Sequence, residues 1–357
     1  MPLHSADPVE QFRLLVEQLE VCHDLILTET PAKARMALIL LDNVAEIVLF
    51  RLSERTLDSD TYLKWIKPKR LSIAKKRTLD RVFRAKVELA CSEYSVGEPT
   101  ATILNILHSY RNAAFHRDTH NPSVMTILAR VAFKAVSDFF AETRAGIELS
   151  SSGRYGAADT EWLTKYGLDR NYIEYEKAAQ VITKQLMMEG EPSLDAVREH
   201  LASDIHSRLT AIRRLIQEDL PWKTREELDP VLKWFEFRDA EPELEDRLSE
   251  HYRNVVYKIT SGQKVDVKRD ELHVLRVKFR AEYEKRLKDY QQHISFDEIS
   301  RLEARIRELS EAITFSSLLQ NYYEIDCVLS TLERYLSLAF QEFDHAVQME
   351  IDLRRGK

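Results

Sequence analysis

Apolar residues spaced three and four positions apart run through most of this chain, and this spacing limits its fold more than any other feature. Such residues share one face of an α-helix, whereas a half-buried strand needs apolar residues at every second position. The chain has only 8 glycines and 10 prolines among 357 residues, and 31% of its residues are charged. That composition favours long helices with solvated faces over a strand-and-turn architecture. We therefore predict an all-α fold.

The spacing also divides the chain into helices and regions. Five helices are expected at 8–27, 31–53, 72–93, 102–120 and 123–143. The serine- and glycine-rich segment 149–156 is the expected linker. We thus predict an N-terminal helical bundle at 1–148 and a C-terminal all-helical region at 149–357 that regulates it or recognises a partner.

An apolar stripe in the C-terminal region covers about two heptads. It consists of Ile299, Leu302, Ile306, Leu309 and Ile313. This length allows a short coiled-coil hairpin, but a stripe of this kind is more typical of intramolecular core.

Nothing in the sequence indicates a membrane or an export route. The longest apolar run, 36–50, is interrupted by Asp42, Asn43 and Glu46 and is too short to cross a bilayer. The N-terminus lacks the basic stretch followed by an apolar segment that is typical of a secretory signal. The three cysteines are far apart and odd in number, which indicates reduced thiols. We expect a cytoplasmic protein.

Charge is distributed unevenly along the chain. The net charge is −7, yet residues 64–86 hold ten basic residues and one acid, so the remainder is strongly acidic. Trp65 and Phe83 lie among the basic residues, an arrangement typical of RNA contact, although most basic runs are ordinary solvated faces. The candidates for RNA binding in this basic strip are Lys67, Lys69, Arg70, Lys75, Lys76 and Arg77.

The expected helix at 102–120 carries a motif that suits phosphate chemistry. It reads Arg111-Asn112-Ala113-Ala114-Phe115-His116. Asn112 and His116 are four residues apart and share one face, which His108 also joins. Arg111 lies about 140° around the helix from His116. Only its long side chain, or a second copy of the helix, brings the guanidinium and the imidazole to one phosphate.

Two acids interrupt the apolar run of the expected second helix. Asp42 and Glu46 are four residues apart in a stretch that is expected to be buried. A buried acid needs a cationic or hydrogen-bonding partner, and Arg111 and His116 are the obvious candidates. The other interpretation is a solvated notch or a purely structural network.

These features resemble the HEPN superfamily (higher eukaryotes and prokaryotes nucleotide-binding) over about residues 8–145. Its helical bundles present an arginine, a polar residue and then a histidine on a late helix, with an acid on an earlier one. The resemblance implies a metal-independent endoribonuclease that acts as a homodimer through the motif helix. It also implies a toxin or antiviral effector held in check or activated by a partner protein.

The same resemblance implies a role for each residue. His116 would act as a general base toward the ribose 2′-OH or as an acid toward the leaving 5′-oxygen. Arg111 would bind the scissile phosphate, and Asn112 would orient the imidazole or the phosphate. Asp42 or Glu46 would hold Arg111 or set the histidine tautomer. The products would carry a 2′,3′-cyclic phosphate and a 5′-hydroxyl, with no cofactor.

The motif allows two other interpretations, a metal site and a non-catalytic scaffold. His116 and His120 have the spacing of helical metal ligands, but the glutamate of His-Glu-x-x-His is missing and two nearby arginines would repel a metal. We therefore expect no metal site. The main alternative to an enzyme is a non-catalytic helical scaffold that binds RNA, a nucleotide or a partner protein.

Overall fold

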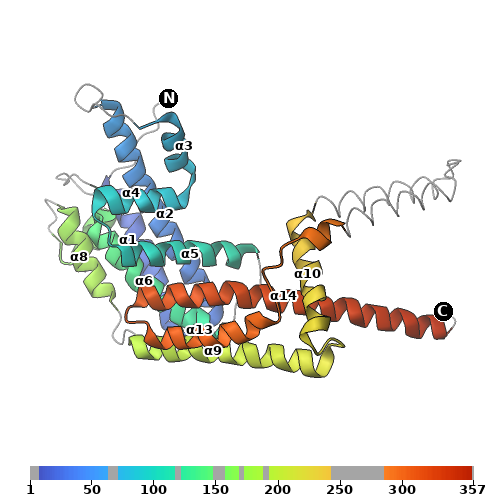
Figure 1. Ribbon diagram of the computed structural model, residues 1–357. Coiled ribbons are helices and arrows are strands. Elements are labelled where there is room, and N and C mark those ends of the chain that lie inside the picture. Colours follow the sequence, from blue (N-terminus) through green and yellow to red (C-terminus); the bar gives the residue numbers. More distant parts are fainter. Residues whose placement is uncertain are drawn as a thin grey trace, which may run out of the picture. The chain divides into compact units, whose positions relative to one another are not determined.

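A computed structural model describes residues 8–62, 71–116, 122–147, 157–168, 173–187, 193–242 and 285–355 (Figure 1). Over these ranges the chain forms helices and no β-strand, which confirms the predicted all-α fold. None of the helices in these ranges is long and apolar enough to span a membrane. The chain groups into two compact units, one of Met1–Asp204 with Glu308–Tyr323 and the other of Ile205–Arg307 with Glu324–Lys357.

The first unit contains the helices of the N-terminal bundle and two that follow it. They are α1 (Pro8–Leu27), α2 (Pro31–Tyr62), α3 (Ile73–Arg81), α4 (Phe83–Tyr94), α5 (Glu98–His116), α6 (Pro122–Glu142), the short 3₁₀ turn η1 (Arg144–Gly146), α7 (Ala157–Lys165) and α8 (Tyr175–Leu186). Two longer helices, α9 (Leu194–Arg214) and α14 (Phe315–Arg354), contribute residues to both units.

Helix α2 is the centre of the first unit, and it packs against α1, α4, α5 and α6 (Figure 1). Its Leu41, Leu49 and Leu52 have almost no exposed surface, and burying each such side chain stabilises the fold by about 1.5–3 kcal/mol. The helix begins at Pro31 as expected. It continues nine residues beyond the predicted end at Ser53, because the segment to Tyr62 contains no glycine or proline. Ser53 stays inside the helix, with its hydroxyl donating to the Leu49 carbonyl.

The helix expected at 72–93 is two helices. Val82 adopts an extended conformation between α3 and α4, with φ −103° and ψ 114°. The break leaves Val82 exposed while Leu79 and Phe83 on either side of it are buried. Val82 is β-branched and therefore loses little by leaving the helical conformation. The prediction of one continuous helix was wrong, because burial on both sides of Val82 outweighs local helical preference.

Helices α7 and α8 pack against α1 within the first unit. The Phe12 ring lies 5.7 Å from the Trp162 ring and 5.2 Å from the Tyr175 ring, centroid to centroid. Tyr166 donates a hydrogen bond to Glu20, whose carboxylate also pairs with Lys165 at 2.7 Å. The expected linker at 149–156 lies outside the described residues.

The second unit includes the π-turn η2 (Leu215–Asp219), α10 (Arg225–Ala240) and the first part of α13 (Asp297–Glu311). Arg208 of α9 holds α14 in this unit: its guanidinium donates to Asp326 at 2.6 Å and to Glu333 at 2.7 and 2.9 Å. Burial opposes the charge on Arg208, but these carboxylates outweigh it and raise the Arg208 pKa.

The apolar stripe of α13 serves mainly as core. Leu302 and Leu309 are fully buried, whereas Ile313 lies beyond the helix end and is 86% exposed. The stripe is thus shorter than its sequence indicates, and its buried part packs inside the chain.

Candidate active site

The motif helix α5 is positioned by its apolar face. Leu104 and Leu107 are buried, and α5 packs against α2, α4 and α6. Arg111 is one-third exposed and Asn112 is exposed, so the polar part of the motif begins where the buried face ends. His116 is the last residue of α5, and its side chain lies outside the described part of the molecule.

Asp42 of α2 is completely buried, and side chains of α5 face its carboxylate. The Arg111 Nε atom is 3.4 Å from Asp42 Oδ2. The His108 Nδ1 atom is 3.1 Å from Oδ1 and 3.2 Å from Oδ2. Burying a carboxylate is costly unless it is paired and hydrogen-bonded. The acid that interrupts the apolar helix therefore has partners on the motif helix.

Arg111 is held by more than the carboxylate. Its Nη1 donates a hydrogen bond to the Asn112 side-chain oxygen at 3.0 Å, so the first two residues of the motif are in contact. The neighbouring Tyr110 is buried and packs edge-to-face on Tyr323, with ring centroids 5.5 Å apart. This contact fixes the turn of α5 that presents Arg111.

His108 was predicted to lie on the motif face but not to be a site residue. Its ring stacks on Phe83 of α4, with centroids 3.9 Å apart and an interplanar angle of 3°. The sequence signal that points to it is its spacing: His108 is three residues before Arg111, and such residues are neighbours on a helix. Stacking on one face and Asp42 at one edge hold the imidazole in a single orientation.

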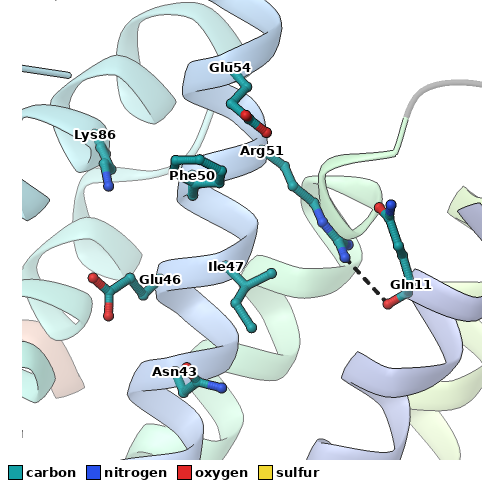
Figure 2. Close-up of a pocket in the computed structure, with 8 residues that line it drawn as sticks. All are labelled: Gln11, Asn43, Glu46, Ile47, Phe50, Arg51, Glu54 and Lys86. Atoms are coloured by element: carbon teal, nitrogen blue, oxygen red, sulfur yellow. Dashed lines mark hydrogen bonds between the residues drawn. The ribbon is translucent and has the colours of Figure 1, made fainter. Parts of the chain in front are cut away.

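Glu46, the second acid of the apolar run in α2, lines a pocket of about 450 Å³ (Figure 2). The remaining lining residues are Gln11, Asn43, Ile47, Phe50, Arg51, Glu54 and Lys86. Arg51 donates to the Gln11 carbonyl oxygen at 3.4 Å, as the dashed line in Figure 2 shows, and burial lowers its pKa. Lys86 is buried with its Nζ 5.3 Å from the centre of the Phe50 ring. Asp42, His108 and Arg111 are not among the lining residues of this pocket.

Part of the basic strip is exposed and part is engaged in packing. Lys75 and Arg77 of α3 are exposed. Lys76 pairs with the buried Asp60 of α2 at 2.7 Å, which attaches α3 to α2. The other RNA-binding candidates, Lys67, Lys69 and Arg70, lie outside the described residues.

Among the residues that the structure describes, no three histidine, cysteine, aspartate or glutamate side chains are grouped so that they could hold a metal ion. Asp42, His108 and Arg111 together offer one buried acceptor, one imidazole and one guanidinium. Such a set is able to bind a phosphate and to exchange a proton. No protein-family model, no curated protein and no solved structure matches this chain.

Proposed function

We propose that this protein is a metal-independent endoribonuclease of the HEPN type. The observation that supports this most is the contact between Asp42 and Arg111: an acid of the second helix, buried in an apolar stretch, faces the arginine of the Arg-x4-His motif at 3.4 Å. This is the link between helices that the resemblance leads one to expect. A guanidinium anchored by a buried carboxylate is preorganised for a phosphate, because it needs little rearrangement on binding.

The proposed reaction begins with attack of the ribose 2′-oxygen on the adjacent phosphorus. Arg111 binds the non-bridging phosphate oxygens and stabilises the charge that builds up in the transition state. The 2′-proton passes to a base, the bond from phosphorus to the 5′-oxygen breaks, and an acid protonates that oxygen. His116 is one proton-transfer group of this reaction, and Asn112 orients Arg111. DNA lacks the 2′-OH and is not a substrate.

We further propose that two copies of the chain act together through α5, and that exposed residues of the basic strip such as Lys75 and Arg77 guide RNA to the site. A role as a toxin or antiviral effector, controlled by a partner protein, belongs to the same proposal.

The competing proposal is a non-catalytic helical scaffold. The complete burial of Asp42 favours this proposal, since a buried carboxylate paired with an arginine is also a common structural anchor. In a scaffold, the motif would serve only to join α5 to α2.

The His116→Ala variant separates the two proposals. In an enzyme this change abolishes cleavage of end-labelled structured RNAs, including tRNA, while the far-ultraviolet circular dichroism and the affinity for RNA stay at the wild-type level. In a scaffold, wild type and variant cleave nothing, and only assembly or stability changes. The Lys75→Ala variant is a control outside the motif, and it should weaken RNA binding without abolishing cleavage.

A further inference from the structure

Asp42 brings together two side chains from one face of α5. His108 and Arg111 are one turn apart, and both point polar atoms at the same carboxylate, at 3.1 and 3.4 Å. The carboxylate has no exposed surface, but the His108 and Arg111 side chains are 21% and 32% exposed. A buried acid thus supports two groups that reach solvent side by side.

The contacts of the imidazole determine which of its nitrogens faces outward. An ionised carboxylate only accepts hydrogen bonds, so Nδ1 carries the proton that is donated to Asp42. In the neutral ring the other nitrogen, Nε2, is then an acceptor. Because Phe83 stacks flat on the ring, rotation that would exchange the two nitrogens is hindered. An aspartate that orients a histidine through Nδ1 is the arrangement that makes Nε2 an efficient general base.

Helix geometry favours His108 over His116 as the first partner of Arg111 within one chain. Three residues along a helix correspond to a separation of roughly 60° and about 4.5 Å, whereas five residues correspond to about 140° and about 7.5 Å. On one helix, the position three residues from Arg111 is therefore nearer to it than the position five residues away.

We infer that His108 is a catalytic residue of the proposed reaction, with Asp42 as its positioning residue. His108 Nε2 accepts the proton of the 2′-OH as the 2′-oxygen attacks phosphorus, and His116 donates a proton to the 5′-oxygen as it leaves. One proton is taken up and one is released, so the reaction needs no co-reactant. This inference rests on the proposed function, because it names the base of that reaction.

The chain contains a matched control histidine. His23 of α1 has its Nδ1 3.5 Å from an Asp24 carboxylate oxygen, and its side chain is 22% exposed. Its ring lies 5.9 Å from Phe133, which is a looser contact than the stacking of His108. Each of the two histidines thus lies beside its own carboxylate, and the two side chains are similarly exposed. His108 also lies one turn from Arg111, and His23 does not.

The first part of the test measures cleavage of structured RNA by the full chain. His108→Ala should lower kcat by about 10²–10⁴-fold, the usual contribution of a general base. Added imidazole should restore part of the rate, which a purely structural role does not allow. Asp42→Asn should lower kcat with little change in KM, and His23→Gln should cleave at the wild-type rate. Cleavage by His108→Ala at the wild-type rate would overturn the inference.

The second part of the test does not depend on turnover. Histidine ring resonances of the labelled protein are followed by NMR while cytidine 2′-monophosphate is added. The His108 resonance should shift, the His23 resonance should stay in place, and Arg111→Ala should remove the shift of His108. If the wild type cleaves RNA, the His108 resonance does not shift and His108→Ala cleaves at the wild-type rate, the inference fails and the proposed function stands. If His108 shifts but no RNA is cleaved, the phosphate site stands and the ribonuclease proposal fails. If no RNA is cleaved and the His108 resonance does not shift, both the inference and the proposed function are rejected.

Discussion

Asp42 has no exposed surface and faces two partners, His108 and Arg111. When one partner is removed, the other still compensates the buried carboxylate. We predict that His108→Ala and Arg111→Ala are not additive in the free energy of unfolding. The double variant leaves the buried carboxylate without either partner and should lose more than the sum of the single losses, by roughly 0.5–3 kcal/mol. Urea unfolding of the wild type, both single variants and the double variant measures this coupling. Strictly additive losses would contradict it.

Cys22 gives a prediction for pH and reactivity. Burial raises its thiol pKa to about 12. Since the folded-state pKa lies above that of the unfolded chain, the stability that the buried thiol contributes is present below its ordinary pKa and is lost as the pH rises toward 12. At pH 8, iodoacetamide should modify the exposed Cys327 in the native protein and reach Cys22 only after unfolding. Peptide mass spectrometry measures both rates. Equal rates in the native protein would refute the prediction.

The sequence indicates Asp42 more clearly than His108. An acid in a long apolar run signals a buried partner, and Asp42 indeed faces the motif arginine. Glu46 has the same signal but lines the neighbouring pocket, because four residues place it about 6 Å further along α2 than Asp42 and about 40° around the helix axis. The spacing of His108 from Arg111 can be seen in the sequence, but its stacking on Phe83 cannot, since Phe83 belongs to another helix and contacts His108 only in the folded unit.

At the scale of helices, a buried arginine joins α9 to α14 in the second unit. Arg208 is 12% exposed and bonds to Asp326, which is 9% exposed, and to Glu333. Arg208→Ala leaves a buried carboxylate uncompensated and should destabilise this unit by about 3–5 kcal/mol. Arg214→Ala on the same helix removes only an exposed pair with Glu218 and should leave the melting temperature unchanged. Thermal unfolding followed by circular dichroism compares the two, and equal losses would contradict the prediction.

Helix boundaries follow the sequence where local chemistry sets them. The helix α1 spans the predicted residues 8–27, and Pro31 begins α2 as expected. The motif helix α5 begins at Glu98, four residues earlier than predicted, because Pro99 is compatible with a first helical turn. The break at Val82 could not be predicted, since it depends on where Leu79 and Phe83 are buried in the folded unit.

At the scale of the whole molecule, the proposed homodimer gives a prediction. Light scattering should give a mass twice that of the 41.7 kDa chain. If His116 acts on the site of the other copy, a mixture of the Arg111→Ala and His116→Ala proteins should cleave RNA faster than either alone. A mixture of Arg111→Ala and His108→Ala should show no such gain. Arg111 and His108 contact Asp42 of their own chain, so each site of a mixed dimer still lacks one of the two residues. A monomeric mass, or a gain in the second mixture, would contradict the prediction.

The most direct test of the proposed function is incubation of the purified full-length protein with end-labelled structured RNAs in excess EDTA. The ends of the products are then identified chemically. We predict fragments with a 2′,3′-cyclic phosphate and a 5′-hydroxyl from the wild type, and none from Arg111→Ala, because the reaction uses the 2′-OH and needs no metal. Absence of cleavage by the wild type, or cleavage that EDTA abolishes, would contradict the proposal.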